Sequence, residues 1–236
     1  MSAAQLGVQL DATGRPFDAV NFGDATAETR RLGVMHFPAG EVRIMDGNAV
    51  EVDPSFFDAV SVTFDVEDLE ASIVWVSEEI NGQRFETVLG VRLDVGGSTV
   101  ARWGSFEFAY GTDGGVGAIT SQAVRDRAAQ AASEPPFIPN VNYEAPLQLF
   151  DVDGIPGSDT LIFSNGFGDG AFPMTRGVDG SGNLVSILIW DTRYPWRLAV
   201  PDGIPPRDIT TREDQLQECL EGTRPVDQYG HCADQP

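Results

Sequence analysis

Alternation of hydrophobic and polar residues dominates this chain and predicts β-strands. Residues 60–64 and 71–76 alternate clearly, and residues 84–93 continue the pattern over a longer run. Turn-forming residues such as Asn81-Gly82 separate these runs. Short alternating runs with turns between them are typical of antiparallel sheets. We therefore expect an α+β, mainly β fold: an antiparallel sheet or sandwich with two or three short helices.

Residues 184–190 are predicted to form an interior strand. Their sequence, Leu-Val-Ser-Ile-Leu-Ile-Trp, is almost continuously apolar, which implies burial on both faces. Turn-forming residues 179–183 precede this run, so we expect it to pair with the segment that ends at Val178. A further hairpin is expected between residues 42–44 and 49–52, because Asp-Gly-Asn separates them.

Helices are predicted in two places. Residues 120–132 are rich in alanine, and the Thr and Ser at their start are good helix caps. Near the C-terminal end, Thr210 and Glu213 have the spacing of a capping box, and Gly222 fits a C-terminal cap. We therefore expect residues 210–236 to form a helix and tail.

The organisation of the chain indicates one domain. Residues 133–146 contain four prolines and form a predicted loop, but the strand-like runs on both sides have faces that need covering. We therefore treat this segment as a loop within a single domain that spans residues 1–236.

Charge excludes some classes of partner. The chain has 36 acidic against 15 basic residues, for a formal net charge of −21, and every basic residue is arginine. Binding to nucleic acid and to anionic membranes is therefore disfavoured, since both need clustered cations. Two interpretations of the acidity stay open. It keeps the protein soluble through mutual repulsion, or it reflects a high-salt habitat or mimicry of an acidic ligand.

Targeting signals and cysteines give limited information about the location and chemistry of the protein. The first residues lack a basic n-region, and no apolar stretch is long enough for a membrane span, so we expect a soluble, cytoplasmic protein. Cys219 and Cys232 could form a disulfide that ties the tail to the last helix, or stay thiols in a reducing compartment. With His231 they give three candidate zinc ligands, one short of a structural site. We expect no cofactor.

Two glycine-rich turns hold the main candidates for chemistry. Asp113 lies in one turn and Asp169 in the other, each after a strand-like run. At a common end of the sheet, the two carboxylates could share a proton or a divalent cation, with Ser164 and Gly168 as neighbouring binding residues. In the alternative, each aspartate accepts hydrogen bonds from local amides as an Asx-turn. The glycines of the first turn would then allow a tight join between a strand and the following helix.

An aromatic–arginine cluster follows the apolar strand. Trp190, Arg193 and Trp196 lie within seven residues of one another, and such mixtures are enriched in binding hot spots. The same composition also arises where a core strand leaves its sheet and its aromatic residues pack under a proline-rich loop. Both interpretations stay open.

The two turns together resemble a known family. Residues 112–117, Thr-Asp-Gly-Gly-Val-Gly, and residues 164–173, Ser-Asn-Gly-Phe-Gly-Asp-Gly-Ala-Phe-Pro, are similar to the two turn motifs of the bacterial family called domain of unknown function 4241. The resemblance covers roughly residues 85–191. The chain has Phe167 where the family has tryptophan, and an extra residue after Ser164. The resemblance implies a site region but no chemistry.

These sequence features lead to two hypotheses about function. The leading hypothesis is a soluble, non-catalytic interaction protein of bacterial origin, with an immunity or regulatory role as one setting, that binds a protein partner or a small ligand. The alternative is a hydrolase or divalent-metal-dependent enzyme that uses Asp113 and Asp169.

Overall fold

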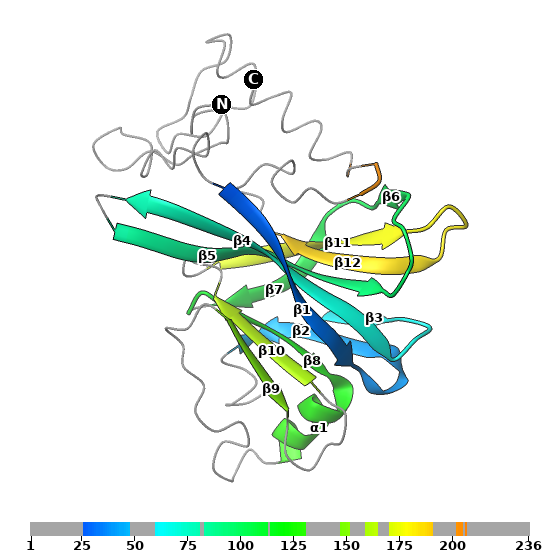
Figure 1. Cartoon of the computed structure of the whole chain (residues 1–236). Helices are drawn as coiled ribbons and strands as arrows, with labels where there is room; N and C mark the ends of the chain where they lie inside the picture. Colours follow the sequence, from blue (N-terminus) through cyan, green and yellow to red (C-terminus); the bar gives the residue numbers. More distant parts are fainter. Residues whose placement is uncertain are drawn as a thin grey trace, which may run out of the picture.

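The computed structural model describes residues 26–47, 60–80, 83–112, 114–130, 147–151, 159–164, 170–190, 202–204 and 206. These residues form two antiparallel β-sheets (Figure 1). The first sheet has seven strands: β1 (Thr26–His36), β4 (Asp68–Ile80), β5 (Gln83–Val95), β12 (Leu184–Trp190), β11 (Gly170–Val178), β6 (Arg102–Trp103) and β7 (Glu107–Thr112). They are hydrogen-bonded in the order β1-β4-β5-β12-β11-β6, and β7 also pairs with β11.

The second sheet has five strands in the order β3-β2-β8-β10-β9. Their bounds are Val60–Thr63 for β3, Glu41–Asp46 for β2, Val116–Ser121 for β8, Asp159–Ser164 for β10 and Leu147–Asp151 for β9. One α-helix, α1 (Gln122–Gln130), and one 3₁₀ turn, η3 (Pro38–Gly40), complete the described elements. The expected mainly β, antiparallel fold is confirmed.

The hydrophobic core lies between the two sheets. Strands β2, β8 and β10 contribute Val42, Ile44, Ile119 and Leu161, and strands of the larger sheet contribute residues such as Leu93 and Ile187; all are completely buried. The alternation in β2, where Val42 and Ile44 face the core, follows the pattern of its sequence. Burial of these apolar faces is therefore the main force that joins the two sheets.

The interior strand is the best-predicted element. Strand β12 lies between β5 and β11, and six of its seven residues are buried. It pairs with β11 across the turn at 179–183, as the sequence predicts. Asp179 fixes this turn, because its carboxylate accepts hydrogen bonds from the backbone N–H groups of Ser181 and Asn183 at 2.8 and 2.9 Å. These bonds lower the pKa of Asp179.

The helix at 120–132 begins as predicted but has a different neighbour. The Oγ of Ser121 accepts a hydrogen bond from the N–H of Val124 at 3.2 Å, so the serine is the cap of α1. However, the first glycine-rich turn does not join a strand to this helix, which is a correction. Strand β8 stands between them, and all six of its residues are buried. Its small residues gave it too little apolar character to be recognised as a strand.

Some predictions lie outside the described residues: the hairpin partner at 49–52, the loop at 133–146 and the helix and tail at 210–236. Strand β2 pairs with β3 on one side and with β8 on the other. In the part of the chain that the structure describes, no helix is long and apolar enough to span a membrane.

Candidate functional site

Two regions hold the candidate functional residues. The first is the sheet junction, where the chain passes twice between the sheets: from β7 to β8, and from β10 to β11. Thr112 at the end of β7 pairs with Gly170 at the start of β11. Ser164 at the end of β10 pairs with Val116 at the start of β8. The two glycine-rich segments therefore leave one sheet and enter the other at directly opposed positions.

The structure gives information on the predicted aspartates only through the residues next to them in the chain. Asp113 directly follows Thr112, and Asp169 directly precedes Gly170, so each aspartate is one peptide bond from a member of the same antiparallel pair. Asp113, Asp169 and Gly168 themselves lie outside the described residues, and their roles stay predictions.

Glycine and threonine shape the first crossing. The Oγ1 of buried Thr112 accepts hydrogen bonds from the N–H groups of Gly114 and Val116 at 3.1 and 3.3 Å. Gly115 has a φ of +67°, which favours glycine. A Cβ at Gly117 would lie 2.7 Å from the Tyr110 hydroxyl oxygen, so the aromatic ring requires a glycine below it. These contacts give the glycines a structural role.

Asp46, whose Asp-Gly-Asn sequence predicts a turn, is a buried carboxylate at this junction. It is the last residue of β2, is 1% exposed, and shares the core-facing side of the strand with Val42 and Ile44. Its register partner in β8 is Gly117. The alternation of Val42, Ile44 and Asp46 is the signal that could have identified it as an inward-facing acid.

Trp190 belongs to the core. It is 0% exposed, and its ring lies against Gly90, its register partner in β5. Of the two interpretations of the aromatic–arginine cluster, core packing therefore holds for Trp190, and a binding role does not. Arg193 and Trp196 lie outside the described residues, as do Cys219 and Cys232.

His36 is surrounded by carboxylates. Its Nδ1 lies 2.7 Å from Asp68 Oδ1 and its Nε2 3.8 Å from Glu67 Oε2, while its backbone N–H donates to Asp159 at 3.1 Å. The hydrogen bond to Asp68 is the main reason that the pKa of His36 is raised, with charge interactions from Asp68, Glu67 and Asp159 adding to it. Since Asp159 belongs to β10, His36 joins the two sheets.

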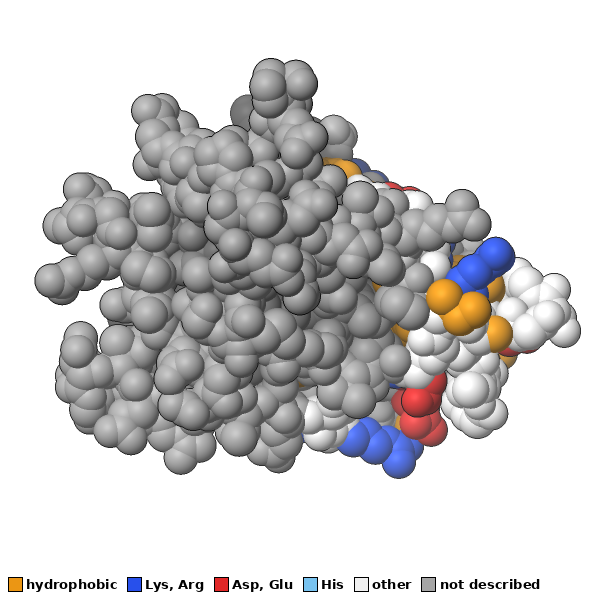
Figure 2. All heavy atoms as spheres, turned by 90° about the horizontal axis from the view of Figure 1, so that it is seen from above, with side chains coloured by type: hydrophobic (Ala, Val, Ile, Leu, Met, Phe, Trp, Pro, Cys, Tyr) orange, Lys and Arg blue, Asp and Glu red, His pale blue; other side chains and the backbone are white. Residues whose placement is uncertain are grey.

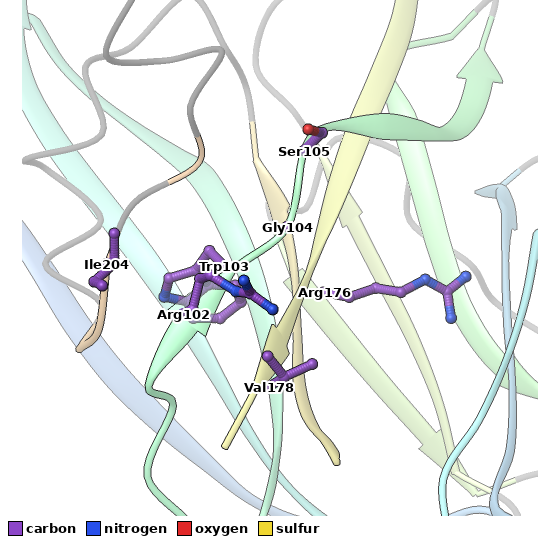
Figure 3. A pocket seen from close by; sticks show the side chains of 7 residues that line it. All are labelled: Arg102, Trp103, Gly104, Ser105, Arg176, Val178 and Ile204. Carbon is purple, nitrogen blue, oxygen red and sulfur yellow. The ribbon is translucent and has the colours of Figure 1, made fainter. Parts of the chain in front are cut away.

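The second region is the β6 cavity, an open hollow of about 630 Å³. It is lined by Arg102, Trp103, Gly104, Ser105, Arg176, Val178 and Ile204, and Figure 3 shows how they lie. The residues come from the two-residue strand β6, the adjoining segment 104–105, β11, and the separate segment at 202–204. None of them was a predicted site residue, because the cavity forms only when these distant segments meet.

Backbone hydrogen bonds hold the walls of the β6 cavity. Trp103 N–H donates to Ile204 O at 2.9 Å, Ile204 N–H donates to Ala101 O at 3.0 Å, and Gly104 N–H donates to Arg176 O at 2.9 Å. The Trp103 indole N–H donates to the carbonyl of Asp202 at 2.7 Å. Gly203 has a φ of +90°, and a Cβ there would lie 2.7 Å from a backbone oxygen, so this bend requires glycine.

Known proteins add no assignment to either region. Comparisons with protein-family models, with curated proteins and with solved structures found no match to this chain. The resemblance of the glycine-rich turns to domain of unknown function 4241 therefore stays a prediction. Within the described ranges, no three His, Cys, Asp or Glu side chains are grouped so that they could hold a metal ion.

Proposed function

We propose that this protein is a non-catalytic interaction protein that binds a small ligand in the β6 cavity. The observation that carries the proposal is the cavity itself. Its volume of about 630 Å³ lies within the roughly 300–1,000 Å³ that small-molecule sites occupy. Tryptophan and arginine contribute to its lining, and both are frequent in binding hot spots.

The walls of the cavity support a binding role because they are preorganised. Strand β6 is hydrogen-bonded to β11 on one side and bridged to Ile204 on the other. A ligand would therefore meet a surface whose backbone is already fixed, which lowers the entropy cost of binding.

The setting we propose is regulatory or immunity-related, in the bacterial cytoplasm. The net charge of −21 argues against nucleic acid and anionic membranes as partners. A ligand that binds only the folded protein also stabilises it by mass action. Such a protein could report the presence of its ligand to a second protein.

A thermal-shift screen of small organic molecules tests the proposal. Ligands that raise the melting temperature of the wild type should lose their effect in Ser105→Trp, because the new ring takes up space in the cavity that Ser105 lines. They should keep it in Ser61→Trp, which adds the same ring at an exposed position of the other sheet. Stabilisation that survives in Ser105→Trp would contradict the proposal.

A second candidate function is an enzyme that uses Asp113 and Asp169. The observation that favours it is the pairing of Thr112 with Gly170, because each aspartate adjoins one of these residues. A pair of carboxylates at such a junction could bind a divalent cation or divide acid and base roles.

Metal titrations test this second candidate. Mg²⁺, Mn²⁺ or Ca²⁺ should raise the melting temperature of the wild type, and Asp113→Asn and Asp169→Asn should each abolish the shift. Equal shifts in the wild type and both variants would count against a shared carboxylate site.

A further inference from the structure

Arg92 lies over the ring of Trp103, and Arg102 and Arg176 line the β6 cavity. Arg92 and Arg176 are already paired with carboxylates. The Arg92 guanidinium lies 5.4 Å from the centre of the Trp103 ring, and its Nε is 2.7 Å from Asp94. Arg176 forms an ion pair with Glu107. In Figure 3 the Arg176 guanidinium points away from Arg102. The positive charge on these two side chains is therefore largely balanced by local carboxylates.

Arg102 differs from the other two arginines. Its side chain is exposed and lines the cavity, and its guanidinium forms no ion pair or hydrogen bond with any other side chain among the described residues. In a chain with a net charge of −21, such a cation at the opening of a cavity is unusual. A guanidinium in this position is available to an anion from outside the protein.

The neighbours of Arg102 are apolar on both sides. Strand pairing puts Val178 opposite Arg102 in β11, and a parallel bridge puts Ile204 beside it on the other side. Paired residues of a sheet project from the same face. Val178, Arg102 and Ile204 therefore form one row across the cavity, a cation between two aliphatic side chains (Figure 3).

The side chains of this row are accessible from solvent. Ile204 is 64% exposed, so its side chain is accessible to a ligand from solvent. In Figure 2, basic and hydrophobic side chains lie next to each other at one edge of the described surface. A ligand with both an anionic and an apolar part would satisfy both kinds of side chain.

We infer that the β6 cavity binds a small organic carboxylate with an apolar body, and that Arg102 is the residue that holds its carboxylate. This inference rests on the proposed function, because it names the ligand class for the same cavity. The planar guanidinium matches a carboxylate through two parallel hydrogen bonds. The apolar body lies on Val178 and Ile204. A dianionic phosphate is less suitable, because only one uncommitted cation faces it and the whole chain repels added negative charge.

Calorimetric titration with matched probes tests the inference. 1-Naphthoate carries a carboxylate on an apolar ring, and 1-naphthalenemethanol has the same ring without the charge. The wild type should bind naphthoate at least tenfold more tightly than the alcohol. Arg102→Gln should lower the affinity for naphthoate about tenfold or more and leave the affinity for the alcohol unchanged. Since Arg102 is exposed, this variant should fold, and its circular dichroism spectrum checks that it does.

Arg31→Gln is the matched control. Arg31 lies on β1, at the opposite edge of the same sheet, and forms an exposed ion pair with Glu70 of β4. Its loss should therefore not change the affinity for naphthoate. Equal affinities of the wild type for both probes, with no effect of Arg102→Gln, would overturn the carboxylate assignment but leave the cavity as a binding site. Tighter binding of 1-naphthyl phosphate than of naphthoate would also overturn it. If the wild type binds none of the probes, the carboxylate assignment falls, and the ligand screen with Ser105→Trp decides the proposed function separately.

Discussion

Gly90 shows how one residue makes room for a large side chain in the core. It lies opposite Trp190, which is the largest completely buried side chain among the described residues. A Cβ at Gly90 would lie 2.7 Å from Trp190 Cε3 and 2.9 Å from a backbone oxygen. The glycine is therefore needed because the indole ring occupies the space above it, and its backbone conformation is ordinary.

Gly90→Ala should lower the free energy of unfolding by about 1–3 kcal/mol, as expected for overpacking in a core. Gly180→Ala is the control, because a Cβ there would meet nothing within 4 Å, and the change should stay within about 0.5 kcal/mol. Urea denaturation of both variants measures the difference. Equal effects of the two substitutions would contradict the packing described for Trp190.

His36 should make stability depend on pH. Its pKa is raised above the ordinary value of 6.5, chiefly by the hydrogen bond to Asp68. A group whose pKa is higher in the folded state stabilises the fold most below its unfolded pKa, and this contribution disappears as the pH rises through the folded pKa. The stabilisation from His36 should therefore be complete below about pH 6.5 and decline above it.

Melting temperatures of the wild type and His36→Gln between pH 5 and 9 test this expectation. The wild type should lose its advantage over the variant as the pH rises, and Asp68→Asn should reduce the same dependence. The direction of the pH dependence follows from the groups that face His36. Glu67, Asp68 and Asp159 are all carboxylates, and each favours the charged form of the imidazole. A difference in melting temperature between the wild type and His36→Gln that stays constant from pH 5 to 9 would contradict the stabilising role of charged His36.

At the scale of elements, the sequence predicted strands whose pattern is local. The apolar run at 184–190 could be assigned to an interior strand because both faces of β12 are buried. Strand β8 was missed because glycine, alanine and threonine fill half of it, although every one of its residues is buried. Its character depends on neighbours in β2 and β10, which a local pattern does not contain.

The crossing from β7 to β8 depends on Thr112. Thr112→Val keeps the shape of the side chain but removes the acceptor for the N–H groups of Gly114 and Val116. The free energy of unfolding should fall by about 1–2 kcal/mol. Thr112→Ser keeps the hydroxyl and should recover most of the loss, as denaturant titration of the two variants can measure. A larger loss in the serine variant would mean that the methyl group matters more than the hydrogen bonds.

At the scale of the whole molecule, the two candidate regions arise from contacts between distant segments. The pairing of Thr112 with Gly170 brings together the residues that flank Asp113 and Asp169 in the chain. The β6 cavity joins Arg102 to Ile204, and no periodicity in the sequence indicates that contact. The glycines and aspartates that make the sheet junction a candidate are visible in the sequence. The β6 cavity has no such pattern, because it is formed by a two-residue strand and by side chains from distant segments.

The most direct test of the account is an NMR titration of the ¹⁵N-labelled wild type with 1-naphthoate. We expect amide shifts to concentrate at Gly104, Ser105, Val178 and Ile204, and at the Trp103 indole N–H, which forms part of the cavity wall. Shifts that concentrate instead at Thr112, Val116, Ser164 and Gly170 would move the binding site to the sheet junction and contradict the assignment of the β6 cavity.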